Sequence, residues 1–330
     1  MKHFTISPTV KTKYFCITGT LCLIVLVIFS FFIGKYPLSM ELLFSGDPMQ
    51  LRVFFTLRLT RTIVALIGGF SLGVAGFVYQ TIFRNPLASP DIIGVSSGAS
   101  VGAAAGILFL TGEASITFCA FAGALFAVIL SLTLSSIDRS SRNSTIVLAG
   151  ISVHALAQTI LMFLKISADP ERELASIEYW LMGSLNGISA YSMKGNLFIC
   201  LFCLIMLFLL HRQVILLSAE EGEARMLGVS VMKLRFIILF MTTLVVASIV
   251  SMTGLISFVG LLAPHGARLL SNNNRVDTML LSGLMGGILL VGSDIFVRSF
   301  TVTELPVSIF TSLLGAPFLI YLIIRERRSV

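Results

Sequence analysis

The chain has 330 residues, of which 56% are hydrophobic and 12% are charged, and its formal net charge is +7. Soluble domains carry about 25% charged residues, so this composition excludes an ordinary soluble enzyme and predicts an all-α polytopic membrane protein. The basic residues lie between apolar runs, where they orient the chain in the membrane and give no sign of nucleic-acid binding. Because no polar stretch is long enough for a separate soluble part, we expect one transmembrane domain over residues 1–330.

Apolar runs recur along the chain, and a run of about 20 residues is long enough to cross a bilayer. We expect ten transmembrane helices, near residues 15–33, 59–83, 92–110, 115–137, 144–166, 194–212, 235–253, 254–270, 278–297 and 306–324. The stretch 235–270 is interpreted as two helices that are broken at Gly254. Both tails are basic and belong in the cytoplasm, which requires an even number of crossings.

Three arginines lie at the expected outer ends of helices, Arg58 and Arg61 on the second and Arg298 on the ninth. In one interpretation they form a rim that docks acidic residues of an extracytoplasmic partner, because a guanidinium binds a carboxylate with two hydrogen bonds. In the other they snorkel or pair locally, and Asp294, one turn before Arg298, is the available partner. The sequence leaves both open.

A polar turn with two prolines, residues 84–90, separates the second and third helices, because neither proline can continue a helix. Four glycines follow the turn at every fourth position: Gly94, Gly98, Gly102 and Gly106. They share one helical face, and a face without side chains lets another helix approach closely. We expect this helix, with Gln80, Asn85 and Pro86 before it, to form the packed wall of a transport pathway.

The longest expected outer loop, 167–192, carries four acidic residues against Arg172 and contains Trp180, the only tryptophan. Tyr179 and Trp180 are expected at the membrane interface, where amphipathic rings settle. The longest expected cytoplasmic loop, 213–234, contains a capping box that begins at Ser218 and predicts a short helix ending at Gly228. In one interpretation this helix contacts a cytoplasmic partner. In the other it is an ordinary solvated connection between two transmembrane helices.

The sequence offers no catalytic machinery. It contains no G-x-x-x-x-G-K-[ST] motif, so it cannot cradle nucleotide phosphates as a P-loop does. His154 and His265 are the histidines at membrane depth, and they lack the spacing of a metal site. We therefore expect no catalytic residue, no cofactor and no bound metal.

An ordered set of motifs resembles the FecCD or BtuC-like permease subunits of type II ABC importers, and it covers nearly the whole chain. The matching stretches are Leu57-Arg-Leu-Thr-Arg61, Gln80, Arg84-Asn-Pro-Leu-Ala-Ser-Pro90, Gly94-Val-Ser-Ser-Gly98-Ala99, Trp180-Leu-Met-Gly-Ser184, Ala224-Arg-Met-Leu-Gly228, Gly254 to Arg268, Glu304-Leu-Pro-Val-Ser308 and Gly315-Ala-Pro317. Thr60 stands where the family usually has proline, which leaves the entry angle of the second helix open.

The resemblance implies a BtuC-like fold of ten helices in the bacterial cytoplasmic membrane, with both termini cytoplasmic. It implies a second permease subunit, identical or paralogous, two cytoplasmic ATP-binding subunits that hydrolyse ATP, and an extracytoplasmic substrate-binding protein. The expected cargo is an iron–siderophore or related metal chelate, with haem or cobalamin as the alternative in the same family. The near absence of charges within the helices favours a chelate, because a bare-cation pathway shows intramembrane carboxylates.

The resemblance also implies roles for particular residues. The segment that couples to the ATPase comprises Ser218, Glu220, Glu221, Glu223, Ala224, Arg225, Leu227 and Gly228. The cytoplasmic gate comprises Asn143, Ser144 and Thr145, and the arginines that meet the binding protein are Arg58, Arg61 and Arg298.

Two other classes of protein fit the sequence less well. A secondary transporter needs its own ion site at mid-membrane, for which the sequence offers only Asp294 and the break at Gly254. An intramembrane enzyme needs a nucleophile and a base that come together, which two scattered histidines do not supply.

Overall fold

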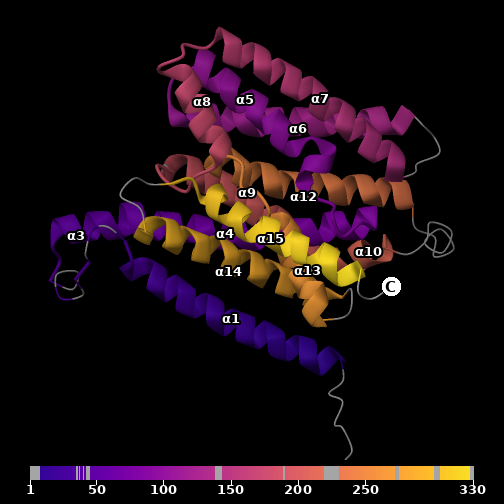
Figure 1. The fold of residues 1–330 in the computed structure, drawn as a ribbon, viewed down its shortest axis with the longest axis horizontal. Coiled ribbons are helices and arrows are strands. Elements are labelled where there is room, and N and C mark those ends of the chain that lie inside the picture. Colours follow the sequence, from indigo (N-terminus) through magenta and orange to yellow (C-terminus); the bar gives the residue numbers. More distant parts are fainter. Residues whose placement is uncertain are drawn as a thin grey trace, which may run out of the picture. The chain divides into compact units, whose positions relative to one another are not determined.

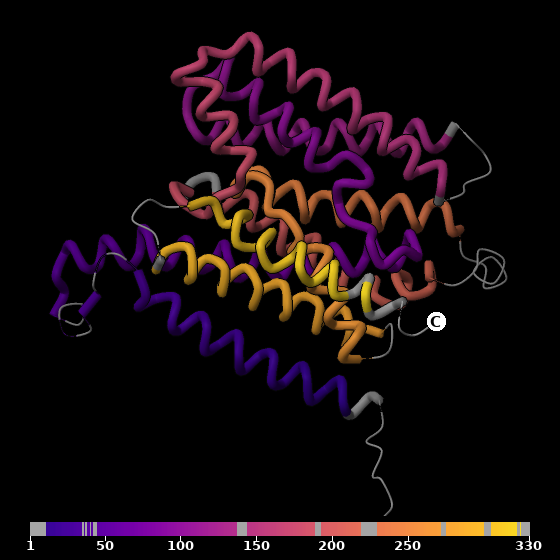
Figure 2. Tube along the Cα trace, in the orientation of Figure 1, coloured from indigo at the N-terminus to yellow at the C-terminus, as the bar shows by residue number. Residues whose placement is uncertain are grey.

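The computed structural model describes residues 8–34, 36, 38–39, 41, 45–137, 143–188, 190–218, 230–271, 275–300 and 305–327. Within those ranges every regular element is a helix, as Figure 1 and Figure 2 show. The chain divides into two compact units. Unit 1 comprises Met1–Phe77 and Ser257–Val330, and unit 2 comprises Val78–Ile256. The single domain expected over residues 1–330 stays a prediction.

Unit 1 is built around α14. Its helices are α1 (Pro8–Phe32), α3 (Pro48–Arg52), the greater part of α4 (Thr60–Phe83), α13 (Val259–Ser271), α14 (Val276–Phe300) and α15 (Val307–Arg327). A π-helical segment, Val53–Leu59, joins α3 to α4 without a break. Helix α14 packs against α1, α13 and α15.

Unit 2 is built around α6 and α12. Its helices are α5 (Val95–Phe109), α6 (Glu113–Ile137), α7 (Asn143–Ser167), α8 (Glu173–Met182), α9 (Ala190–Leu209), α10 (His211–Leu216) and α12 (Val231–Thr253). A 3-10 turn, Pro90–Ile93, precedes α5. Helix α6 packs against α5, α7 and α12, and α12 also packs against α9.

Six of the described helices are long and apolar enough to cross a membrane: Lys11–Phe32, Pro48–Phe83, Glu113–Ser136, Ser144–Ser167, Val231–Thr253 and Val276–Ser299. Three shorter apolar helices are Val95–Phe109, Met193–Leu209 and Val307–Tyr321. Helix length therefore does not establish the expected ten crossings. The expected break at Gly254 is confirmed, because α12 ends at Thr253, Gly254 has a φ of 71° and α13 begins at Val259.

Glycines bring helix α5 into main-chain contact with α6. A Cβ atom added to Gly98 would lie 2.5 Å from the carbonyl oxygen of Gly123, and one on Gly106 would lie 3.0 Å from Ile116 Cα. A Cβ on Gly102 would overlap the carbonyl oxygen of Cys119. The four-residue spacing therefore produces the close helix contact that it predicts.

Gly94 differs from the other three glycines, which corrects the expectation that all four share one helical face. It is the N-cap of α5 and has a φ of 85°, in the left-handed region. Glycine adopts this conformation without the steric cost that a Cβ atom brings. Gly94 therefore allows the chain to turn from Pro90–Ile93 into α5.

We expect the substitution Gly102→Ala to lower the free energy of unfolding by about 1–3 kcal/mol, as overpacking of a tight interior does. The matched control is Gly195→Ala in α9, where an added Cβ meets nothing within 4 Å and helix propensity favours alanine by up to about 1 kcal/mol. Thermal unfolding of the purified full-length variants in detergent measures both effects. If the Gly102→Ala and Gly195→Ala variants unfolded at the same temperature, the close α5–α6 contact would be contradicted.

Candidate functional site

Asp294 forms ion pairs with two arginines inside unit 1. Its Oδ1 lies 2.6 Å from Arg61 Nε, and its Oδ2 lies 3.0 Å from Arg298 Nη2. Asp294 is fully buried, and Arg61 and Arg298 are only 7% and 6% exposed. Each arginine thus has a counter-charge at hydrogen-bond distance, which burial of a charge requires. With Arg58, these residues are called the arginine cluster below.

The arginine cluster holds the C-terminal end of α1. Arg298 donates from Nη1 to the Ser30 carbonyl oxygen at 3.2 Å and from Nη2 to the Ser30 hydroxyl at 2.6 Å. The same hydroxyl lies 2.8 Å from the Thr62 hydroxyl on α4. The last carbonyls of a helix have no partner within the helix and attract cations. Arg298 supplies both the hydrogen bonds and the positive charge.

Arg58 serves the same helix end from the π-helical segment. Its guanidinium donates to the Ile33 carbonyl oxygen and, at 3.0 Å, to the Tyr36 carbonyl oxygen. A Cβ atom on Gly34 would overlap this guanidinium, so glycine at that position leaves the space that Arg58 occupies. The chain leaving α1 is therefore held by an arginine 22 to 25 residues further on.

The local-pairing interpretation describes these three arginines. Arg58, Arg61 and Arg298 all turn inward onto groups of their own unit, and none is more than 7% exposed. Their docking to an extracytoplasmic partner stays a prediction. The sequence could suggest the pair Asp294–Arg298 from its four-residue spacing, but nothing local indicated that Arg61 reaches the same carboxylate across 233 residues.

Thr60 marks the end of the π-helical segment. Its hydroxyl donates to the carbonyl oxygen of Phe55, five residues earlier, at 3.2 Å. Short π-helical turns inside α-helices often occur at functional sites. Thr60, which stands where proline is usual in the family, lies within one continuous helix, Pro48–Phe83. The arginines on either side of it, Arg58 and Arg61, are both buried.

In unit 2, the turn after α4 is closed by hydrogen bonds around Asn85. Its amide donates to the Gln80 carbonyl oxygen at 3.2 Å, and its side chain accepts from the Leu87 amide at 2.9 Å. Gln80 is buried, whereas Asn85 and Pro86 are exposed. Asparagine favours such turns because its side chain can replace a backbone acceptor.

The expected gate residues begin α7, which packs on the turn before α5. Helix α7 starts at Asn143, Ser144 is exposed and Thr145 is half-buried. A Cβ atom on Gly150 would overlap the carbonyl oxygen of Ile92 in the 3-10 turn. A movement of α7 along its axis would therefore press directly on the main chain of that turn.

The expected coupling segment is described only at its start. Ser218 follows α10, and its hydroxyl donates to the Ile215 carbonyl oxygen at 2.6 Å. The remaining residues lie outside the described part of the chain: Glu220, Glu221, Glu223, Ala224, Arg225, Leu227 and Gly228. The capping box and the short helix stay predictions.

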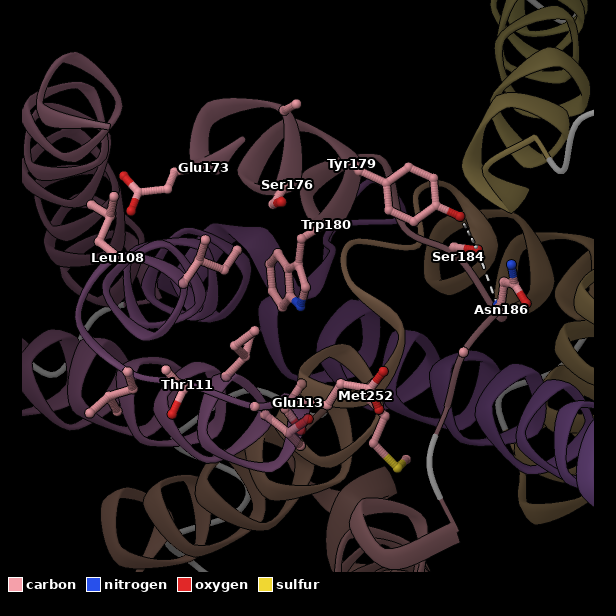
Figure 3. A pocket seen from close by; sticks show the side chains of 18 of the residues that line it. Leu108, Thr111, Glu113, Glu173, Ser176, Tyr179, Trp180, Ser184, Asn186 and Met252 are labelled. Carbon is pink, nitrogen blue, oxygen red and sulfur yellow. Dashed lines mark hydrogen bonds between the residues drawn. The ribbon is translucent and has the colours of Figure 1, made fainter. Parts of the chain in front are cut away.

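A cavity of about 1080 Å³ opens beside α8 in unit 2. Its lining comes from the end of α5, the start of α6, one face of α8, residues 184–188 and the end of α12. Figure 3 shows Trp180 projecting from α8 toward the segment that carries Thr111 and Glu113. The sequence placed Tyr179 and Trp180 at a membrane interface, and the structure adds that both line this α8 cavity.

Helix α8 has two distinct faces. Leu174, Ile177 and Leu181 pack into a core with residues of α5 and α7, at the three- and four-residue spacing of one helical face. Glu173, Ser176 and Trp180 repeat the same spacing on the face that lines the cavity. The apolar face fixes the helix, so the polar face and the indole are held over the cavity.

The far end of α8 is held by main-chain contacts. The Ser184 amide donates to the Thr253 carbonyl oxygen at 2.7 Å, and a Cβ atom on Gly254 would overlap the Trp180 carbonyl oxygen. Gly254 therefore has two functions, since it ends α12 and also allows α8 to cross the chain there.

The two histidines at membrane depth lie in different units and have different surroundings. His154 is exposed on α7, and the His265 ring meets Phe318 edge-on at a centroid distance of 5.9 Å. Over the described residues, no group of three His, Cys, Asp or Glu side chains is arranged to hold a metal ion.

Comparison with known proteins places this fold in a family. The FecCD transport family model matches residues 22–325. The chain belongs to the FecCD transport family. It is 38% identical over 278 residues to a probable iron chelatin transport system permease protein of Helicobacter pylori, with 83% of each chain covered. It is 37% identical over 273 residues to the cobalamin import system permease protein BtuC of Halobacterium salinarum, covering 82% of this chain and 73% of that one.

A solved structure supports the same assignment. An inward-facing metal-chelate type ABC transporter matches with a TM-score of 0.84 and 32% identity, covering 94% of this chain and 98% of that chain. This FecCD protein is a multi-pass membrane permease subunit of an ABC importer. It is not itself an enzyme, because the ATPase activity of such transporters lies in separate subunits. Membership implies ATP-binding partners and a second permease subunit.

We expect Asp294→Asn to cost about 3–5 kcal/mol, because it leaves two buried guanidinium groups without their counter-charge. The matched control, Glu178→Gln, also removes one carboxylate, but from a pair with Lys165 whose side chains are 46% and 28% exposed. A surface pair of this kind contributes at most about 1 kcal/mol. Thermal unfolding of both full-length variants in the same detergent makes the comparison, and equal stability would refute a structural role for the Asp294 pairs.

Proposed function

We propose that this permease imports an iron–siderophore complex or a related metal chelate across the cytoplasmic membrane. It works with a second permease subunit, identical or paralogous, two ATP-binding subunits and an extracytoplasmic binding protein. The observation that carries this proposal is the family match over residues 22–325, together with the structural match to a metal-chelate type transporter. The iron chelatin relative favours iron chelates. Cobalamin is the alternative cargo, since one relative is a cobalamin permease. Haem, the other cargo expected from the family resemblance, belongs to the same alternative.

The proposed topology has ten crossings with both termini in the cytoplasm. Each expected apolar run contains a described helix: α1, α4, α5, α6, α7, α9, α12, α13, α14 and α15. Helices shorter than about 20 residues span a bilayer less easily, and α5 and α13 are the shortest of the ten, with 15 and 13 residues. Basic tails at both ends support the even count.

The proposed mechanism is alternating access driven by rigid helix movements. ATP-driven closure of the partner subunits pushes the coupling segment 218–228 and moves the gate at Asn143, Ser144 and Thr145. The contact between Gly150 and Ile92 supports this route, because it joins the gate helix α7 to the turn that leads into α5. The close α5–α6 contact then lets Gly98, Gly102 and Gly106 move with their partner as part of the pathway wall.

The binding protein is proposed to dock at the end of unit 1 that carries the arginine cluster. Within the cluster, Arg61 and Arg298 pair with the carboxylate of Asp294, whereas Arg58 donates to main-chain carbonyl groups, so the cluster has a net positive charge. The excess of positive charge favours an acidic surface on the partner by its field. The arginines are proposed to keep their internal contacts during docking. They contribute the positive potential of the docking surface and hold its main chain in place.

An ion-coupled secondary transporter is not favoured. The one intramembrane carboxylate that the sequence offered for a coupling ion was Asp294. Its two oxygens are 2.6 Å and 3.0 Å from arginine nitrogens. Those arginines already provide the charge that a coupling cation would supply.

Uptake should depend on the P-loop of the partner ATPase. The test co-expresses this permease with the ATP-binding and binding-protein genes found beside it and measures cellular uptake of radioactive iron presented as a ferric hydroxamate. Replacing the P-loop lysine of the ATPase should abolish uptake, because that lysine contacts the nucleotide phosphates. Uptake that survives this variant, or that requires only a proton gradient, would contradict the importer assignment.

Topology is tested by labelling single cysteines at the two ends of α6, a helix about 37 Å long at ~1.5 Å per residue. In a background without the five native cysteines, Glu113→Cys and Ser136→Cys place thiols at exposed positions. A membrane-impermeant maleimide should label position 113 on intact spheroplasts and position 136 only after permeabilisation. The reverse pattern would invert the proposed orientation.

A further inference from the structure

We propose that the α8 cavity binds the transported chelate and selects complexes of neutral or positive net charge over polyanionic ones. The inference rests on the proposed function, since it concerns the cargo of that importer. It is carried by the cavity itself: a volume of about 1080 Å³ whose walls combine apolar side chains, an indole and charged groups of mainly one sign.

The charged groups of the lining are acidic in excess. Glu113, Glu171 and Glu173 line the cavity, and Arg172 is the basic side chain among the lining residues. Three carboxylates against one guanidinium leave a formal charge of minus two. Lys165, on neighbouring α7, lies 2.9 Å from Glu178, which is outside the lining, so that cation is already paired.

Helix dipoles do not reverse this sign. Helices α6 and α8 begin at the cavity, and each has a glutamate in its first turn. Helices α5 and α12 end at the cavity, with Leu110 and Thr253 in its lining. A helix start carries about half a positive charge and a helix end about half a negative charge, so the four ends offset one another. The carboxylates therefore set the potential.

The α8 side of the cavity is pre-formed. The Asp169 carboxylate accepts from the amides of Glu171 and Arg172, each at 3.0 Å, and Glu173 accepts from the Asp169 amide at 2.9 Å. These bonds fix the main chain at the start of α8 and the carboxylate of Glu173. The core face of α8 holds the helix from which Trp180 projects into the lining. A cationic or neutral chelate meets an indole face favourably through cation–π attraction or apolar contact.

The volume and chemistry suit a chelate better than a bare ion. Binding sites for drug-sized ligands span about 300–1,000 Å³, so the cavity matches a bulky complex. A triply negative complex, such as a ferric tris-catecholate, would face like charges. A ferric trihydroxamate is neutral or, with a pendant ammonium group, singly positive, and it meets no such repulsion.

The test uses the full-length permease in lipid nanodiscs and the fluorescence of Trp180, the single tryptophan of the chain. Ferric complexes quench a nearby indole, so quenching reports occupancy of this cavity without a label. The probes are the singly positive ferric complex of desferrioxamine B, its neutral N-acetylated form with the same iron donors, and a triply negative ferric tris-catecholate. Affinity should fall in that order, and the difference should shrink at high salt because ions screen exposed charges.

Two glutamines separate charge from shape. The double variant Glu113→Gln and Glu173→Gln keeps the acceptor oxygens and should weaken binding of the positive complex roughly three- to tenfold, as loss of two exposed ion pairs does. Binding of the acetylated complex should change less than about twofold. The control Glu178→Gln removes a carboxylate from the same helix outside the lining, and it should leave all affinities unchanged. The variant Trp180→Phe has no tryptophan fluorescence, so its binding is measured by equilibrium dialysis with radioactive iron. Its affinity for the positive complex should be roughly two- to fivefold lower.

Any of three outcomes would overturn the proposal. The first is that no probe quenches Trp180 in a saturable way, and the second is that the tris-catecholate binds as tightly as the hydroxamates. The third is that the double variant and Glu178→Gln have equal affinities for every probe. The importer assignment is tested separately, by the dependence of uptake on the ATPase P-loop. If uptake keeps that dependence while Trp180 is never quenched, only the cavity assignment falls.

Discussion

Main-chain contact between helices, made possible by glycine, is the constraint on which both units depend. Lipid tails are as apolar as the side chains that face them, so burial alone does not drive helices together, and close packing of small residues takes its place. In unit 1, glycines of α4 meet main-chain atoms of α13 and α14, and in unit 2 α5 meets α6. The pairs are Gly69 with Gly286, Gly73 with Ser282, Gly76 with Gly260, and Gly98 with Gly123.

The buried charges of unit 1 are compatible with this packing because they are satisfied within it. Charged groups at membrane depth are costly unless they pair or reach water. Asp294 pairs with Arg61 and Arg298. Arg58 and Arg298 also donate to the carbonyl oxygens of Ile33 and Ser30 at the end of α1, which no helical bond satisfies. Two requirements, counter-charges for arginines and donors for a helix end, are thereby met by one set of contacts.

Unit 2 combines rigid packing with an open polar surface. Helix α8 places Ile177 in a core and Trp180 over a cavity, and its far end crosses the chain at Gly254. A FecCD permease needs no catalytic group, because its task is to bind cargo and change access. The proposed mechanism therefore depends on three features: rigid helix movements, the contact of α7 with the turn before α5, and the charge of the cavity lining.

Local sequence determined the long apolar helices and the family, but it did not indicate α8, which lies in the expected outer loop 167–192. Hydropathy, glycine and proline act over a few residues, so the helix expected near 92–110, observed as α5 (Val95–Phe109), and the break at Gly254 followed from the sequence. Ordered motifs indicated the FecCD family. Only the tertiary structure decided the direction of the arginines and the existence of the α8 cavity. Both depend on segments far apart in the chain: Arg61 and Asp294 are separated by 233 residues. No local pattern records such a distance, because it is set by how whole helices pack.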